Sequence, residues 1–350
     1  MAIAMLSMND LSIHQIKHGN DVHLKIFICE FITGGGLYRE PLPPSLLAEG
    51  ELMRDAALRD FSQIADIETV VTCDARLDAP TNAHLVHVVG VEQDIWARWE
   101  QCIASVDAVL LIAPETNGSL ERLTMLAEKL SKLVLGSSSS AVKLAGNKWL
   151  SYEAFIAHGI PTLNTYLASA LPITLYGAHV AKPLDGAGCD DMAYIEDELT
   201  LRVWLKDRLT THIVQPYQVG ETASFSMFCQ HGQAYLLSCN RQDVRLQGQH
   251  FSYHGGEMNG LSRYAQNFNV LAQKIAHAIP GLAGYVGVDL IVHEDSFFVL
   301  EVNPRLTTSY VALHQACGCN PAQMLLDLFY NASFIMPEIY HRKVEVLLNA

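Results

Sequence analysis

The sequence has little positive charge for its size. It contains 23 lysines and arginines against 37 aspartates and glutamates, which gives a formal net charge of −14. Proteins that bind nucleic acid usually gather lysine and arginine into a basic patch, and an acidic surface is disfavoured at an anionic membrane. We therefore expect neither nucleic acid nor a membrane among the partners of this chain.

Long apolar runs are also missing. No run reaches the roughly 18 apolar residues that a membrane-spanning helix needs. The first 22 residues are too polar for the apolar core of a signal peptide, so residues 1–22 are expected to form a polar N-terminal extension. With 50% hydrophobic and 17% charged residues, the composition is that of a globular protein. These features predict a cytoplasmic globular protein.

The cysteines lack the spacings of metal and disulfide frameworks. The eight cysteines are scattered, and the one close pair, Cys317 and Cys319, is separated by a single residue. Redox and zinc motifs use two residues between cysteines, and disulfide scaffolds are short, loop-rich chains. We therefore expect free thiols in a reducing cytosol.

What is present is an alternation of strand-like and helix-like segments over residues 23–138, which predicts a parallel sheet with crossover helices. A chain of 350 residues favours two or three subdomains. The glycine and serines at 136–140 mark the first boundary. We expect a second unit at 139–215, a third at 216–332 with two antiparallel hairpins, and a C-terminal tail at 333–350.

The clearest chemical signal lies in the predicted hairpin at residues 284–303. Asp289 lies on its first strand, while Glu301 and Asn303 share one face of the second because side chains alternate along a strand. A turn near 294–295 brings Asp289 and Glu301 roughly opposite each other. Two carboxylates and an amide oxygen suit Mg²⁺, with Mn²⁺ as an alternative. A capped turn with two solvated acids would explain only one of these carboxylates.

Two lysines and a glycine loop are candidate phosphate ligands. Lys148 begins a helix, and Lys182 ends an apolar strand. Either ammonium group can reach a phosphate as a point charge. The loop "DGAGCDD" that follows offers the backbone N–H groups of Gly186 and Gly188. It matches neither the dinucleotide-binding nor the P-loop pattern, and an ordinary turn is the alternative.

In this order, the motifs resemble those of the ATP-grasp superfamily over residues 139–328. The resemblance implies an α/β protein of the ATP-grasp fold, in which an N-terminal parallel α/β subdomain precedes central and C-terminal α+β subdomains that clamp ATP. It implies these ATP contacts: Lys148, Lys182, Gly186 and Gly188 for the phosphates, Gln215, Tyr217 and Gln218 for adenine, and Glu221 for the ribose. Many members carry Glu where this chain has Gln215.

The same resemblance implies a reaction. Lys182 and Arg305 are implied to be catalytic, with Arg305 facing the reacting carboxylate as its bidentate partner. A structural salt bridge is the alternative for Arg305. The metal ligands implied by the family coincide with Asp289, Glu301 and Asn303.

Four further stretches sharpen the resemblance: "ICEFITGGGL", "NRQ", "YHGGE" and "EVNPRLTTSYVAL". Together they look like the ATP-grasp ligases of methanofuran biosynthesis, of which the tyramine–glutamate ligase family is the named type. The implied activity converts a carboxylate to an acyl phosphate with Mg-ATP, after which an amine attacks to give an amide, ADP and phosphate. The product would serve a methanofuran-like or tetrahydromethanopterin-like one-carbon cofactor. Alternatives are a dipeptide ligase, a carboxylase, or a catalytically silent nucleotide-binding module.

The expected substrates are an acidic amino acid or other carboxylate, and an amine. Arg241 and Arg245 share one face of a predicted strand with Asp243, since they are two residues apart. We expect this face, with Arg305 and Ser309, to bind the substrates. A solvent-facing strand with self-paired charges is an equal alternative, and a homo-oligomer is left open.

The stretch "YHGGE" adds two expectations for the same cleft. Tyr253 and His254 are expected to supply an aromatic wall, and the glycines that follow them are expected to make the segment a flexible lid.

Overall fold

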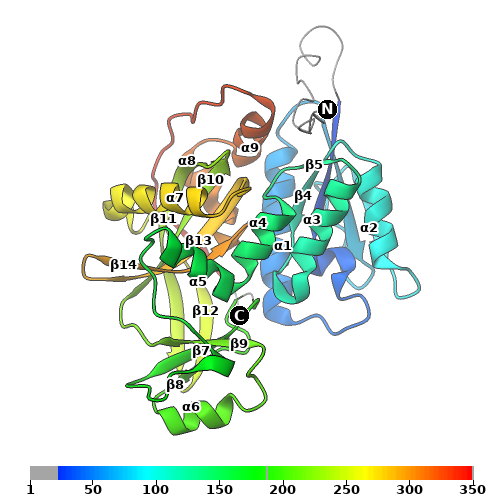
Figure 1. The fold of residues 1–350 in the computed structure, drawn as a ribbon. Helices are drawn as coiled ribbons and strands as arrows, with labels where there is room; N and C mark the ends of the chain where they lie inside the picture. Colours follow the sequence, from blue (N-terminus) through cyan, green and yellow to red (C-terminus); the bar gives the residue numbers. More distant parts are fainter. Residues whose placement is uncertain (1–22, 187, 349–350) are drawn as a thin grey trace, which may run out of the picture.

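A computed structural model describes residues 23–186 and 188–348. The predicted polar extension, residues 1–22, lies outside the described residues. The chain forms three sheets that follow one another along the sequence (Figure 1). They are called here the N-terminal, central and C-terminal sheets.

The N-terminal sheet has five parallel strands, as the alternating pattern predicts. In spatial order the strands are β3 (Leu85–Val89), β2 (Ile67–Asp74), β1 (Leu24–Glu30), β4 (Ala108–Ile112) and β5 (Leu133–Val134). Its helical segments are η2 (Ile32–Gly36), α1 (Pro44–Phe61), α2 (Ile95–Ala104), η3 (Thr116–Gly118) and α3 (Ser119–Lys129). The strands at the centre are buried on both faces because helices cover both (Figure 1).

The central sheet is small and antiparallel. Its four strands, in spatial order, are β6 (Tyr166–Leu167), β9 (His212–Pro216), β7 (His179–Pro183) and β8 (Ala193–Ile195). The helical segments of this region are α4 (Ser139–Gly146), α5 (Lys148–Ala157), η4 (Ala168–Ala170) and α6 (Glu198–Trp204). The side chain of Asn147 caps α5 by accepting hydrogen bonds from the N–H groups of Trp149 and Leu150. This cap places Lys148 at the first helical position.

The C-terminal sheet has six antiparallel strands and provides most of the site. In spatial order they are β14 (Ser296–Asn303), β13 (Gly284–His293), β10 (Glu221–Gln230), β11 (Gln233–Gln247), β12 (His250–Met258) and β15 (Val344–Leu347). The helical segments are η5 (Ser262–Tyr264), α7 (Ala265–Ala278), η6 (Thr308–Ala312), α8 (Leu313–Cys317) and α9 (Pro321–Tyr330).

Helix α7 covers one face of the C-terminal sheet, and alternation along β10 decides which side chains point toward that face. Phe225 and Met227 are fully buried and pack with Phe268 of α7 in one core cluster. Thr222 and Ser224 therefore point to the opposite face, which is open to a cavity.

Two segments differ from expectation. "YHGGE", expected as a flexible lid, lies within β12 and is hydrogen-bonded to strands on both sides. The predicted tail, 333–350, includes β15, which pairs with β12 at the edge of the C-terminal sheet. The hairpin turning at 294–295 and the antiparallel pair around His231 are as predicted.

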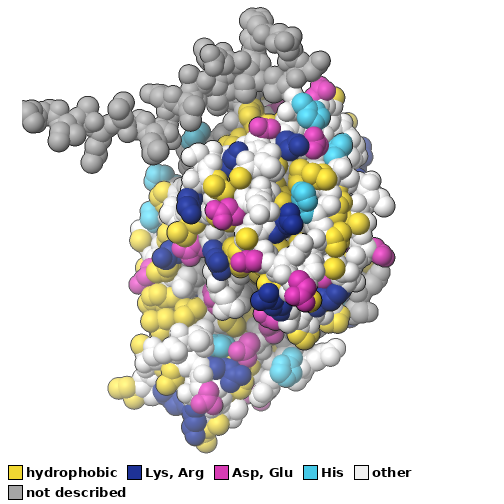
Figure 2. Space-filling model, turned by 90° about the vertical axis from the view of Figure 1, so that its right-hand side faces the viewer, with side chains coloured by type: hydrophobic (Ala, Val, Ile, Leu, Met, Phe, Trp, Pro, Cys, Tyr) yellow, Lys and Arg dark blue, Asp and Glu magenta, His cyan; other side chains and the backbone are white. Residues whose placement is uncertain are grey.

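The expected ATP-grasp architecture is confirmed: a parallel α/β region is followed by two antiparallel sheets. The exact subdomain limits stay a prediction. Among the described residues, no helix is both long and apolar enough to cross a membrane. On the face shown in Figure 2, basic and acidic side chains of the described residues are interspersed.

Candidate functional site

A large cavity lies where the central sheet, the C-terminal sheet and helix α1 meet. Side chains of β7 and β9 line one wall, those of β10 to β14 line the other, and α1 contributes Glu49 and Met53. The cavity encloses about 1320 Å³ of empty space, counting solvent in its mouth.

The two acids of the β13–β14 hairpin lie at the centre of this cavity. Asp289 and Glu301 are directly opposite each other in the strand register, as predicted. The Asn303 amide donates to one carboxylate oxygen of Asp289 at 2.8 Å, and the Gln242 amide donates to the other at 2.7 Å. Burial, followed by the charge of Glu301, raises the pKa of Asp289 to about 7. Two partly buried carboxylates thus lie side by side, and a cation bound between them would offset their mutual repulsion.

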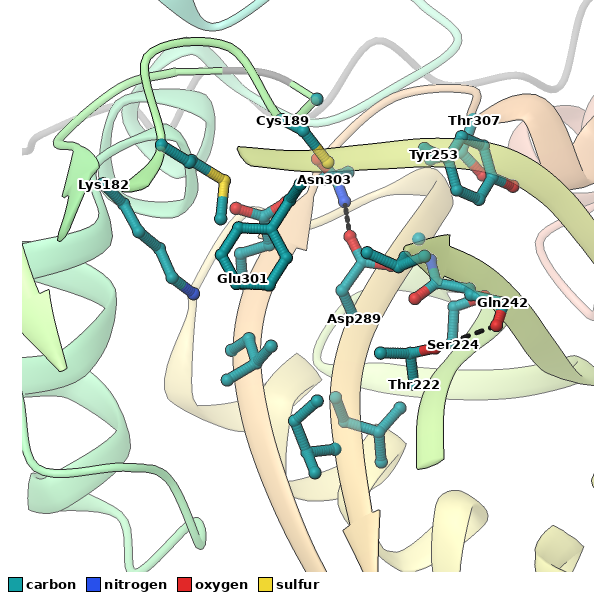
Figure 3. A pocket seen from close by; sticks show the side chains of 18 of the residues that line it. Lys182, Cys189, Thr222, Ser224, Gln242, Tyr253, Asp289, Glu301, Asn303 and Thr307 are labelled. Atoms are coloured by element: carbon teal, nitrogen blue, oxygen red, sulfur yellow. Dashed lines mark hydrogen bonds between the residues drawn. The ribbon is translucent and has the colours of Figure 1, made fainter. Parts of the chain in front are cut away.

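Lys148 and Lys182 supply the positive charge next to Glu301. Lys148 Nζ lies 2.9 Å from a Glu301 oxygen and donates to the carbonyl of Gly186 at 2.7 Å. Burial alone would raise the pKa of Glu301, but Lys148 and Lys182 outweigh it and lower the pKa. Burial lowers the pKa of Lys182 to about 8 against the opposing charge of Glu301. Figure 3 shows Lys182 reaching across the cavity toward the strand that carries Glu301.

The donor set fits a hard divalent cation. Asp289, Glu301 and Asn303 all line the cavity and provide carboxylate and amide oxygens (Figure 3), the ligands that Mg²⁺ prefers. Within the described residues, no group of three or more His, Cys, Asp or Glu side chains is arranged to hold a metal. A cation here would therefore take the rest of its coordination from water or from a bound ligand.

The opposite end of the cavity is mostly apolar and includes the predicted adenine contacts. Gln215 is buried, and its amide nitrogen donates to Thr165 Oγ1 at 2.9 Å. Its Oε1 is buried without a hydrogen-bond partner among the described residues. The backbone N–H of Tyr217 already donates to the carbonyl of Ala178 at 2.9 Å, so it is not free for a ligand. Apolar lining residues here are Leu163, Val180, Met192, Pro216, Leu290, Ile291 and Leu300.

The glycine loop lies at the cavity mouth. Gly188 lines the cavity and has φ +67°, a conformation that suits glycine. Gly186 offers its carbonyl to Lys148. The side chain of Asp185 accepts a hydrogen bond from the N–H of Asn117 at 2.9 Å, which ties the loop to the N-terminal region.

Glu221, expected at a ribose, does not line the cavity. Its carboxylate is held by Arg241 at 2.6 Å and by Arg263 at 2.8 Å. The reason is that side chains alternate along β10. Thr222 and Ser224 face the cavity, so Glu221, next to Thr222, faces the opposite side of the sheet. Glu221 thus lies outside this cavity, and its role at a ribose stays a prediction.

The predicted substrate face of β11 also points away from the large cavity. Arg241 bonds Glu221 and Glu257, and Arg245 is exposed and bonds Asp243. The self-paired alternative therefore describes these charges better. Gln242 and Val244 line the cavity in their place.

Arg305 and Ser309 both line the cavity, as predicted. The Arg305 guanidinium, however, makes a bidentate ion pair with Glu115, with both N–O distances 2.9 Å. Ser309 Oγ accepts a hydrogen bond from the Asn240 amide at 3.3 Å. Arg305 thus faces the cavity and also forms the salt bridge that was considered as its alternative role.

Sequence reasoning missed Glu49 and Met53, which reach the cavity from α1. They lie four residues apart and so share one helix face. Tyr253, predicted as an aromatic wall, does line the cavity and bonds Thr308 Oγ1 through its hydroxyl at 3.0 Å. His254 is not among the lining residues.

Comparison with known sequences places these residues in context. The chain matches a family described as an ATP-grasp domain over residues 145–309, and a pre ATP-grasp 3 domain over residues 67–142. It is 31% identical over 292 residues to a tyramine–L-glutamate ligase from Methanocaldococcus fervens, which covers 82% of this chain and 89% of that protein. The corresponding ligase from Methanocaldococcus jannaschii is 30% identical over 273 residues, covering 77% and 79%.

Solved structures share the fold. An ATP-grasp superfamily protein from Archaeoglobus fulgidus aligns with a TM-score of 0.68 at 24% identity, covering 92% of this chain and 99% of that one. An L-amino acid ligase from Bacillus licheniformis aligns with a TM-score of 0.61 at 16% identity, covering 88% and 73%. At these identities the likeness concerns the fold alone.

Proposed function

Because the chain belongs to the ATP-grasp superfamily of ligases, close to the tyramine–L-glutamate ligases, we propose that it joins the carboxylate of L-glutamate to a primary amine such as tyramine, using ATP. The relatives' names support this choice of substrates. As the methanofuran-type resemblance implies, the amide would be an intermediate of a methanofuran-like or tetrahydromethanopterin-like cofactor.

The central acids and lysines carry this proposal. Asp289, Glu301 and Asn303 would hold Mg²⁺ or Mn²⁺, and a cation bound there supplies neutralisation of charge on the transferring phosphoryl group. Lys148 and Lys182 lie beside Glu301 and would contact the phosphates. The glycine loop, including Gly188, would cover them.

The buried, unpaired oxygen of Gln215 supports adenine at the apolar end of the cavity. An unsatisfied buried acceptor costs about 1–3 kcal/mol, and the exocyclic amine of adenine is a donor of suitable chemistry for Oε1. Because the N–H of Tyr217 is already used, we assign the backbone contact to Gln218, which also lines the cavity.

The reaction follows from this placement. A glutamate carboxylate oxygen attacks the γ-phosphorus of ATP, the bond to the β-phosphate oxygen breaks, and ADP leaves. The amine nitrogen then attacks the acyl carbon, phosphate leaves, and the amine loses a proton. Arg305 lines the cavity and would orient the reacting carboxylate. The hydroxyl of Ser309 would add a neutral contact for the same substrate.

The test is product analysis. Protein is incubated with Mg-ATP, L-glutamate and tyramine, and with bicarbonate, alanine or a pterin-type amine in place of one substrate. We expect ADP and phosphate in equal amounts with the amide, dependent on both substrates. Release of AMP and pyrophosphate, or turnover without glutamate, would contradict the proposal.

A further inference from the structure

The cavity contains one carboxylate that the proposed chemistry does not use. Among the described lining residues the acidic side chains are Glu49, Asp289 and Glu301. Asp289 and Glu301 form the candidate cation site. Glu49 comes from α1 in the N-terminal region and reaches the cavity from there.

Glu49 has no partner of its own. No hydrogen bond or ion pair joins its carboxylate to any residue that the structure describes. The nearby cation is Arg305, whose Nε and Nη2 already donate to the two carboxylate oxygens of Glu115. Burial raises the pKa of Glu49, and the charge of Arg305 opposes the rise. A half-buried carboxylate that lines a cavity and has no protein partner is available to a ligand that brings its own cation.

The helix that presents Glu49 is held beside Glu49 itself and near its C-terminal end. Gly50 lets α1 approach β1 so closely that a Cβ there would lie 2.8 Å from a carboxylate oxygen of Glu30. Three turns later, the Asp60 carboxylate bonds His314 at 2.9 Å, and the Asn320 amide donates to the Asp60 carbonyl at 2.8 Å. Glu49 is therefore preorganised relative to the C-terminal sheet.

The surroundings of Glu49 identify the end of the cavity to which it belongs. The charge of Arg305 acts on Glu49, and α1 packs against η6, which begins at Thr308. The apolar residues proposed to surround adenine include Val180 and Pro216 of the central sheet, and Leu290, Ile291 and Leu300 of the β13–β14 hairpin. Glu49 thus lies in the part of the cavity where Arg305 and Ser309 are proposed to bind a substrate.

We propose that Glu49 binds the protonated primary amine of a substrate. The inference rests on the proposed function for the identity of the two substrates, each of which carries such a group. The ammonium belongs either to the amine substrate or to the α-carbon of glutamate. Both sources present the same chemistry, a charge-assisted N–H donor for a carboxylate.

Equilibrium binding separates this inference from the overall reaction because it needs no turnover. Calorimetry is performed with Mg²⁺ and a non-hydrolysable ATP analogue on the full chain. Each ammonium probe is paired with a neutral analogue in which a hydroxyl replaces the amine: tyramine with tyrosol, and L-glutamate with L-2-hydroxyglutarate. Variants are Glu49→Gln and, as the control on the same helix, Glu51→Gln, whose side chain does not line the cavity.

We expect one pair to show a preference for the ammonium probe of about 10- to 100-fold in the wild type. Glu49→Gln should abolish that preference while leaving the hydroxyl probe unchanged, Glu49→Asp should keep part of it, and Glu51→Gln should keep all of it. Loss in the tyramine pair identifies the amine substrate, and loss in the glutamate pair identifies the α-ammonium. An unchanged preference in Glu49→Gln, or no preference in the wild type, overturns the inference, whereas ADP release judges the proposed function separately.

Discussion

Arg305 and Glu115 form a bidentate ion pair between two regions of the chain, with both N–O distances 2.9 Å. Glu115 follows β4 of the N-terminal sheet, and Arg305 follows β14 of the C-terminal sheet. Their side chains are only 6% and 11% exposed. The pair therefore fixes the N-terminal region against the wall of the cavity in which Arg305 lies.

Removing one partner of this pair should destabilise the protein. Glu115→Ala leaves a buried guanidinium uncompensated, which typically costs about 3–5 kcal/mol. We expect a matching fall in the free energy of unfolding, measured by urea denaturation. The control is Glu121→Ala, whose pairing with Lys143 at 3.8 Å is on the surface and should cost less than about 1 kcal/mol. Equal effects of the two substitutions would contradict a structural role for the pair.

Glu301→Gln should abolish most turnover while preserving the fold. The substitution keeps the side-chain shape but removes the charge that Lys148 contacts and that a cation would need. We expect kcat to fall more than about tenfold, equivalent to at least 1.4 kcal/mol, with an unchanged circular dichroism spectrum. Glu294→Gln, at the exposed turn of the same hairpin, should leave kcat unchanged. Retention of more than a tenth of wild-type kcat by Glu301→Gln would refute the metal assignment.

Lys182→Met should raise the KM for ATP. The buried ammonium lies beside Glu301 at the cavity centre, and loss of a charged hydrogen bond of about 1.5–3 kcal/mol corresponds to a roughly 10- to 150-fold weaker contact. Initial rates at varied ATP provide the measurement. Lys206→Met, an exposed lysine, serves as the control. A KM for ATP that matches the wild type would remove Lys182 from the phosphate site.

The cysteines should behave as eight free thiols. All eight are unpaired in the structure, and only Cys189 and Cys319 are partly exposed. Denatured protein, prepared with air excluded, should titrate with eight thiols, and native protein should be alkylated only at these two. Burial raises the pKa of Cys189 to about 11, so its reaction near neutral pH should be slow.

Cys189 also lines the cavity, so Mg-ATP should protect it while leaving Cys319 reactive. Peptide mass spectrometry of alkylated samples distinguishes the two positions. A disulfide between Cys317 and Cys319, or alkylation of Cys189 that is indifferent to Mg-ATP, would count against this prediction.

The acid pair was predictable in outline, because both acids lie on one short hairpin. The turn at 294–295 sets the register as far as Leu290 opposite Val299, and an irregularity between Leu290 and Asp289 then places Asp289 opposite Glu301. The two lysines and the order of the motifs can be seen directly in the sequence. The ATP-grasp fold followed from that order and is confirmed.

The face of a strand that meets the cavity was not predictable from its own residues. Arg241 and Arg245 do alternate as expected, but their face is the one away from the cavity, as is that of Glu221. The choice depends on α7, which covers the other side of the sheet. Glu49 was missed because its helix meets the cavity only through contacts distant in sequence.

Strand β15 makes the C-terminal segment part of the fold, with a practical consequence for anyone producing the protein. Gly255 in β12 allows the close approach, since a Cβ there would collide with the Val346 carbonyl. A chain cut before Val344 would leave the β12 edge with unpaired N–H and C=O groups, ready to pair with another molecule. Such a truncated protein should therefore associate or precipitate.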